Sequence, residues 1–87
     1  MKRPAIYALI DAERARQSAK FGPRQVHSWG EGDCSSPAVA PIVKVAVLSE
    51  ECGEVARAVL DHAPAADLRD ELVQVAAVAV AWLEGEP

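Results

Sequence analysis

Three glutamates close together in the chain are the first residues whose types and spacing could do chemistry. Glu51 and Glu54 lie three residues apart and Glu50 and Glu54 lie four apart, so in a helix their carboxylates stack along one face. Like charges at these spacings repel each other, and Val43 and Val47 share the same sector of the helix, so the face is not uniformly polar. A hard divalent cation such as Mg²⁺ binds carboxylate oxygens and would offset the repulsion. The pattern is therefore compatible with a metal site and equally with a solvated acidic helix face.

A second oxygen-bearing pair follows later in the chain. Glu71 and Gln74 are again three residues apart, so a helix places them on one face. Asp67 and Asp70 precede them and are better explained as first-turn residues that interact with the helix dipole. If the two helices are antiparallel and joined by a short turn, the glutamates of one can face Glu71 and Gln74 of the other. Such an arrangement builds an oxygen-lined cage inside a helical bundle.

Apolar periodicity predicts three helices that would position these residues, at about 4–20, 41–62 and 66–84. Prolines stand in the first turns of the first two helices, where they are well tolerated, and another proline follows the second helix. Residues from about 22 to 40 are rich in Gly, Ser and Pro and are expected to form an irregular loop without β structure. A loop this long in so small a protein is typical of a functional segment.

The last predicted helix is unusually apolar, because Gln74 is the one polar residue between Leu72 and Leu83. A helix that is apolar all round is buried on all sides, and two other helices cannot cover it completely. A chain of 87 residues also builds only a marginal core on its own. We therefore expect an all-α fold over residues 1–87, a small bundle of three main helices completed by homo-oligomerisation into a homodimer or homotetramer.

Charge, hydropathy and cysteine content exclude several classes of protein. The net charge is −4 and the basic residues are scattered, so the basic face that binds duplex nucleic acid is missing. The longest uninterrupted apolar run, Val75–Leu83, is far shorter than the roughly 20 residues of a membrane-spanning helix. Cys34 and Cys52 match no zinc pattern, and Cys52 is expected to be a buried apolar residue. The expectation is a cytoplasmic protein with reduced thiols that binds neither duplex nucleic acid nor a membrane.

The two acidic sets together resemble a known family. Residues Glu50–Glu54 read E-E-x-x-E, and residues Glu71–Gln74 read E-x-x-D with the final Asp replaced by Gln. Residues Glu13–Gly22, which contain Arg, Gln and Lys and end in Phe-Gly, add to the likeness. With these motifs the chain resembles the MazG-like, all-α nucleoside triphosphate pyrophosphohydrolases of the short phage and actinobacterial type, relatives of the dimeric dUTPases.

The resemblance implies a Mg²⁺-dependent hydrolase, with Mn²⁺ able to substitute, that cleaves a nucleoside triphosphate between its α and β phosphates. The products would be a nucleoside monophosphate and pyrophosphate, and the role would be nucleotide-pool housekeeping. Glu51, Glu54 and Glu71 would be metal ligands, with Gln74 as a neutral carbonyl ligand where the family has Asp. Glu50 would be a further ligand or would orient and activate the attacking water. The metal would neutralise phosphate charge and lower the pKa of bound water.

Two alternatives to the hydrolase stay open. One is a helical oligomerisation or interaction module that retains the fold with weak or no catalysis. The other is a regulator that binds a nucleotide or a metal ion without turnover.

Four residues near the end of the first helix and in the loop carry side chains suited to substrate contact. Lys20 could meet a phosphate as a point charge, and Phe21 or Trp29 could stack on a base. His27 could contact a phosphate or act as a base. Each also has an ordinary structural interpretation, because a helix end, a small core or a loop surface commonly contains such residues.

Overall fold

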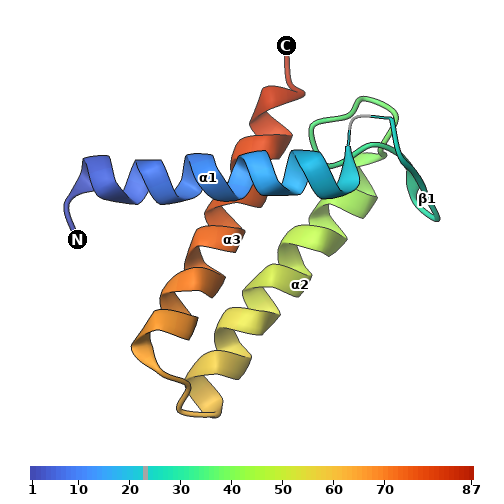
Figure 1. The fold of residues 1–87 in the computed structure, drawn as a ribbon. Coiled ribbons are helices and arrows are strands. Elements are labelled where there is room, and N and C mark those ends of the chain that lie inside the picture. The colour runs from blue at the N-terminus through green and yellow to red at the C-terminus, as the bar shows by residue number, and fades with distance from the viewer. Residues whose placement is uncertain (23) are drawn as a thin grey trace.

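The computed structural model describes residues 1–22 and 24–87, and it is a compact, mostly helical protein with three helices (Figure 1). The helices are α1 (Arg3–Phe21), α2 (Pro41–Leu60) and α3 (Ala65–Glu84). Their bounds lie within two residues of those expected from periodicity. The prediction of a mostly helical protein with three main helices is therefore confirmed.

A tight turn after α2 sets the direction of α3. The backbone N–H of Ala63 donates to the carbonyl of Ala58 at 2.9 Å, and that of His62 donates to Val59 at 3.2 Å. These are the two hydrogen bonds of a Schellman motif, which requires a left-handed residue just past the helix end. His62 takes that conformation, with φ 51°. Pro64 then stands at the N-cap position of α3. Helices α2 and α3 run antiparallel as neighbours (Figure 1).

Helix α3 occupies the central position in the fold. It packs against α2 along one side and against α1, which crosses it at a steep angle (Figure 1). Within the described residues, the backbones of α1 and α2 make no close contact with each other. Side chains of α1 and α2 therefore face each other across a space whose floor is α3.

The loop between α1 and α2 contains a small piece of β structure, so the expectation of a loop without β pairing was wrong. Strands β1 (Val26–His27) and β2 (Gly30–Glu31) pair antiparallel, and His27 lies opposite Gly30. Gly30 has φ 132°, a backbone conformation that strongly favours glycine. The sequence pattern missed this hairpin because two-residue strands carry no measurable alternation.

The loop also supplies part of the core. Val39 is 2% exposed, and Cys34 packs with Val78 and Ala81 of α3. At the far end of α3, a Cβ on Gly85 would lie 2.5 Å from the carbonyl oxygen of Ser35, so the loop backbone is in direct contact with this end. The loop is thus an integral part of the fold.

Helical spacing predicts one apolar stripe on α2, formed by Val45, Leu48, Cys52, Val55 and Val59. Most of this stripe is exposed in the fold. Val45 and Val59 are 45% and 56% exposed, and Cys52, expected to be buried, is exposed as a free thiol. The face that α2 turns inward instead contains Lys44 and Glu51 among its valines and leucine. Periodicity identifies an apolar face but does not show which neighbour covers it.

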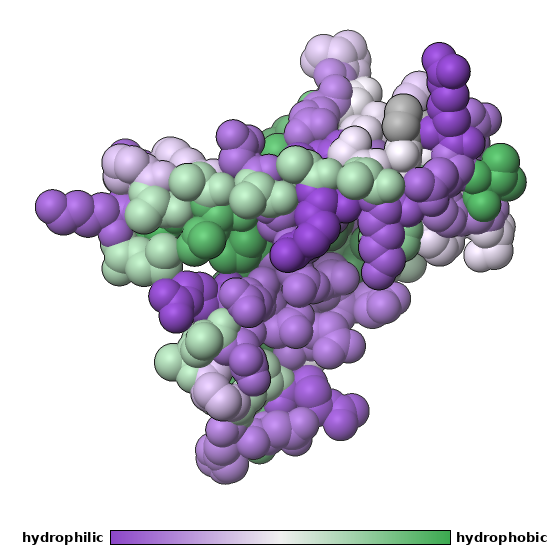
Figure 2. All heavy atoms as spheres, viewed as in Figure 1, coloured by the Kyte–Doolittle hydropathy of each residue, from purple (hydrophilic) through white to green (hydrophobic). Residues whose placement is uncertain are grey.

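The first half of α1 projects beyond the other helices. Ile6, Tyr7 and Leu9 are exposed there, and Figure 2 shows apolar side chains gathered along α1 on this face. The lower part of the α2–α3 hairpin is mainly hydrophilic in the same view. Within residues 1–22 and 24–87, none of the helices is both long and apolar enough to cross a membrane.

Candidate functional site

Two half-buried carboxylates from different helices, Glu51 and Glu71, lie close enough for their charges to interact. Glu51 of α2 and Glu71 of α3 each have one oxygen, Oε2, that is buried and has no hydrogen-bond partner among the described residues. Desolvation raises the pKa of Glu51, and the negative charges of Glu71, Glu50 and Glu54 raise it further. A buried carboxylate without a partner is energetically costly. This pair is therefore the place where a bound cation or a proton would most stabilise the protein.

The other predicted ligands lie beside this pair. A cavity of about 340 Å³, which we call the acidic cavity, is walled by Glu54, Glu71 and Gln74. Three aspartates also line it, and Arg57 supplies positive charge. The full lining is Glu54, Arg57, Ala58, Asp61, Ala63, Asp67, Asp70, Glu71 and Gln74. Among the α2 glutamates, Glu54 lines this cavity with Glu71 and Gln74, whereas Glu50 and Glu51 line other cavities.

A second cavity, of about 460 Å³, lies on the α1 side and is called here the mixed-charge cavity. Glu51 and Gln74 face it from α2 and α3. The rest of its wall comes from α1 and consists of Glu13, Arg16, Gln17, Lys20 and Phe21. Because Gln74 lines both this cavity and the acidic cavity, the two adjoin. The four predicted metal ligands are thus spread over two connected spaces.

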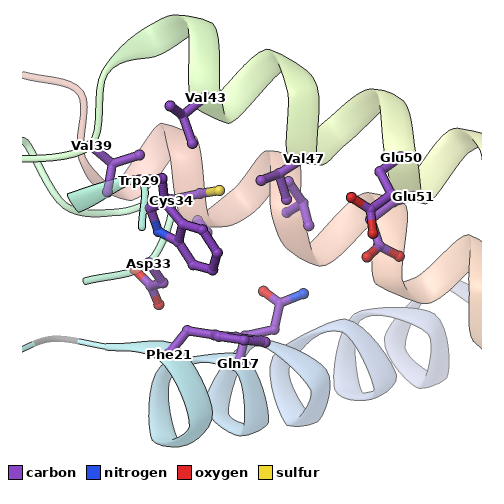
Figure 3. A pocket seen from close by; sticks show the side chains of 12 residues that line it. Gln17, Phe21, Trp29, Asp33, Cys34, Val39, Val43, Val47, Glu50 and Glu51 are labelled. Carbon is purple, nitrogen blue, oxygen red and sulfur yellow. The ribbon is translucent and has the colours of Figure 1, made fainter. Parts of the chain in front are cut away.

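A third cavity, of about 280 Å³ and called the apolar cavity, lies where α1, the loop and α2 meet (Figure 3). Phe21, Trp29 and the valines of α2 form its walls, and Gln17 reaches in from α1. Glu50 and Glu51 extend from α2 at its far end. The full lining is Gln17, Phe21, Trp29, Asp33, Cys34, Val39, Val43, Val47, Glu50, Glu51, Val78 and Ala81. Gln17, Phe21 and Glu51 line both this cavity and the mixed-charge cavity, so the apolar cavity borders the charged one.

The aromatic residues named from the sequence form one cluster at the apolar cavity. The rings of His27 and Trp29 stack at 4.4 Å between centroids and 15° between planes. Phe21 packs against His27 edge-on at 5.8 Å. The Trp29 indole N–H donates to the carbonyl of Gly32 at 3.3 Å, which fixes the ring. Trp29 and Phe21 therefore present surfaces to the cavity from a supported position.

His27 and Lys20 have separate placements. His27 Nε2 lies 2.7 Å from the carbonyl oxygen of Phe21, and because a carbonyl only accepts, this nitrogen carries the proton. His27 lines none of the three cavities, so its observed contacts are structural. The Lys20 ammonium lies 5.0 Å from the Phe21 ring centroid, a cation–π distance, and Lys20 lines the mixed-charge cavity.

A second group of buried charges supports the site from one end. The Arg14 guanidinium donates to Asp33 at 2.8 Å and to Glu84 at 3.0 and 3.1 Å. Ser35 donates to Asp33 from both its backbone N–H, at 2.9 Å, and its hydroxyl, at 2.5 Å. Burial alone would raise the pKa of Asp33, but the Ser35 hydrogen bonds and the Arg14 charge outweigh it and lower the pKa. This Arg14 cluster joins α1, the loop and the end of α3.

Burial by itself shifts the pKa of two other groups near the site in opposite directions. Burial alone would lower the pKa of Arg14, but its bonds to Glu84 and the charge of Asp33 hold it above its ordinary value. Burial raises the pKa of the Cys34 thiol, and the neighbouring Asp33 charge adds to the rise. Cys34 is therefore a neutral group in the wall of the apolar cavity.

Sequence reasoning missed several residues at the site. Glu13, Arg16 and Gln17 line the mixed-charge cavity together with Lys20, and none of the first three was named as a candidate. Their spacing of three and four residues puts them on one face of α1. That spacing was the available signal, but it gains meaning only when the face is known to point toward Glu51.

Comparison with known proteins gave no match to a family model, to a curated protein or to a solved structure. Over the described ranges, 1–22 and 24–87, no three His, Cys, Asp or Glu side chains are arranged as a ready-made metal centre. What the geometry offers a cation is the pair of Glu51 and Glu71, each with one buried oxygen, and the oxygens of Glu54 and Gln74 nearby.

Proposed function

We propose that the protein is a MazG-like, Mg²⁺-dependent nucleoside triphosphate pyrophosphohydrolase. The observation that carries the proposal is the pair of buried oxygens, Glu51 Oε2 and Glu71 Oε2, without partners in the described part of the chain. Carboxylate oxygens are the ligands that Mg²⁺ prefers in proteins, so the donor set fits. The exposed Glu54 carboxylate and the Gln74 carbonyl line the adjoining space. Metal binding would have to draw Glu54 toward the buried pair.

The connected cavities support a nucleotide as substrate. The apolar cavity, with Phe21 and Trp29, suits the stacking of a base. The mixed-charge cavity, with Lys20, suits phosphates. Glu51 lies at the junction of the two, which is where the α phosphate of a nucleotide placed this way would sit. His27 supports Trp29 from behind in this arrangement.

The reaction consumes one water molecule. The water oxygen bonds to phosphorus, the anhydride bond between the α and β phosphates breaks, and the bond's electron pair leaves with pyrophosphate. Glu50, exposed at the edge of the apolar cavity, would orient the water and accept its proton. Bound Mg²⁺ would supply charge neutralisation and a lower pKa for the water. The proposal assigns the chain to cytoplasmic nucleotide-pool housekeeping, and its two free cysteines agree with a reducing compartment.

The test is pyrophosphate release from a panel of canonical and modified nucleoside triphosphates, with Mg²⁺ or Mn²⁺ and an EDTA control. We expect metal-dependent release that falls by about 100-fold or more in Glu54→Gln, the typical effect of removing a group that stabilises transition-state charge. Glu31→Gln, an exposed residue of β2, is the matched control and should leave release unchanged. Circular dichroism shows whether each variant is folded. Absence of release from every substrate by folded protein would favour the interaction module instead.

The second part of the proposal is self-association. The accessible surface of the chain is 5928 Å², whereas a compact monomer of 9.2 kDa exposes ~4,900 Å². The excess of ~1,000 Å² is comparable with the ~800 Å² that each partner contributes to a standard interface. The exposed stripe of α2 that contains Val45 and Val59 is the surface we assign to a second copy.

Sedimentation equilibrium tests this assignment. We expect a mass two or four times 9.2 kDa, and a shift toward the monomer in Val45→Asp, because a charge on an apolar interface is desolvated without a partner. A wild-type mass of one chain at micromolar concentration would contradict it.

A further inference from the structure

The face of α1 that lines the mixed-charge cavity carries a regular set of charges. Glu13, Arg16, Gln17 and Lys20 follow one another at steps of three, one and three residues, so they form one stripe. Glu51 lies on the opposite wall. The cavity thus has cations on one side and the unpartnered carboxylate of the candidate metal site on the other.

The two cations differ in how they are held. Glu13 is 8% exposed, and its carboxylate forms an ion pair with Arg16 one turn further along the helix. The Arg16 side chain is 73% exposed, so Glu13 anchors it at one point while the rest of the guanidinium stays accessible. Lys20 is held beside Phe21 by a cation–π contact. Each cation thus has one contact within α1 and a largely accessible charge beside the cavity.

We propose that Arg16 and Lys20 form the wall that binds the terminal phosphates of a polyphosphate substrate, and that Glu13 is the positioning residue for Arg16. This inference rests on the proposed function for the position of the α phosphate near Glu51. The β and γ phosphates then extend along the α1 stripe, which is where the leaving pyrophosphate needs charge stabilisation. The planar guanidinium of Arg16 matches phosphate oxygens in pairs, and Lys20 adds a point charge.

The charge balance supports a polyphosphate over a single phosphate. The acidic residues Glu13 and Glu51 face the same cavity as the two cations, so a lone phosphate would meet nearly as much repulsion as attraction. A chain of phosphates can place its terminal charges on the α1 stripe and its first phosphate on a cation at Glu51. The inference therefore predicts a preference for triphosphates over monophosphates.

The experiment measures steady-state kinetics and, separately, calorimetric binding of inorganic tripolyphosphate with Mg²⁺. Arg16→Ala and Lys20→Ala are each expected to raise KM and weaken tripolyphosphate binding by about 10- to 100-fold, the effect of losing a charge-assisted hydrogen bond. Arg16→Lys should recover part of the loss. Arg3→Ala, at the exposed start of α1, is the matched control and should change neither quantity.

Glu13 is tested by a double-mutant cycle. Glu13→Gln preserves the shape of the side chain and should raise KM less than Arg16→Ala does. In the Arg16→Ala background it should not raise KM any further, because its positioning role acts through Arg16 and the loss of its own negative charge favours phosphate. Additive effects of the two substitutions would overturn the positioning role.

The two proposals fail in different ways. Normal pyrophosphate release with unchanged KM in both Arg16→Ala and Lys20→Ala would overturn the phosphate wall and leave the hydrolase intact. No release by wild type, with tripolyphosphate binding that Arg16→Ala weakens, would overturn the hydrolase and support the wall. Wild-type protein that neither releases pyrophosphate nor binds tripolyphosphate would overturn both.

Discussion

Two groups of buried charges lie at different places along α3, and they differ in whether their charges are satisfied. The Arg14 cluster pairs its arginine with Asp33 and Glu84, and Ser35 completes the coordination of Asp33. The carboxylates of Glu51 and Glu71 have buried oxygens without hydrogen-bond partners among the described residues. The charges of the first group pair with one another, whereas those of the second would be stabilised by a bound cation or a proton.

The difference separates a structural role from a functional one. Burial pushes the pKa of Asp33 and of Glu51 in the same direction, upward, yet only Glu51 ends above its ordinary value. At Asp33 the protein supplies the compensating donors and positive charge. At Glu51 the neighbours are further carboxylates, so a proton or a bound cation would supply the compensation.

Removing the arginine tests the satisfied group and should have the largest effect on stability. Arg14→Ala leaves Asp33 buried without its cation, and we expect a loss of about 3–5 kcal/mol in the free energy of unfolding, the usual result of breaking a buried ion pair. Urea denaturation measures it. Arg3→Ala at the exposed end of the same helix is the control and should change stability by less than about 0.5 kcal/mol.

The same comparison has a defined pH dependence. Because the folded pKa of Asp33 is lowered, its contribution is present above the ordinary aspartate pKa of about 3.9 and is lost as pH falls through the folded value. The gap between wild type and Arg14→Ala should therefore narrow in acid. A gap that is constant from neutral pH to strongly acidic pH would show that Asp33 is not the partner that matters.

Removing a charge from the unsatisfied group should act in the opposite direction and by less. In EDTA at neutral pH, Glu51→Gln is expected to raise Tm by a few degrees, because the repulsion from Glu71 is relieved. The folded pKa of Glu51 is raised, so its penalty is absent below the ordinary glutamate pKa of about 4.3 and is complete above the folded value. The gain in Tm should therefore disappear in acid.

Calorimetry with and without Mg²⁺ distinguishes the explanations for Glu51. Wild type should be stabilised by Mg²⁺ and Glu51→Gln should not, since only the wild type keeps the proposed ligand. Gln74→Asp adds a charge to the same cavity and is the converse control, with a lower Tm in EDTA. Equal Tm values for wild type and Glu51→Gln in EDTA at neutral pH would mean that the Glu51 charge does not destabilise the metal-free protein.

The sequence predicted the helices well because their signals are local. Apolar periodicity and prolines near the helix starts define α1, α2 and α3 without knowledge of the tertiary structure. The antiparallel α2–α3 turn likewise made it predictable that Glu71 and Gln74 would lie near the glutamates of α2. Homo-oligomerisation and the ligand roles of these residues stay predictions.

The remaining features depend on partners distant in the chain. Arg14 pairs with Asp33, 19 positions away in the chain, and with Glu84, 70 positions away. No local sequence pattern indicates such pairings. Cys52 was expected in the core because its stripe is apolar, but the chain turns Lys44 and Glu51 inward instead. The α1 wall of the mixed-charge cavity escaped for the same reason, whereas the loop hairpin escaped because its two-residue strands show no alternation.

The separation of Arg14 from Glu84 along the chain also bears on the order in which the protein folds. The α2–α3 hairpin closes through a short turn, whereas docking α1 on α3 closes almost the whole chain into a loop and carries a larger entropic cost. The hairpin should therefore form first and α1 dock late, after the transition state. Arg14→Ala would then speed unfolding and leave the folding rate nearly unchanged, which stopped-flow kinetics would reveal. The wall that α1 adds to the candidate site would be the last part of the molecule to assemble.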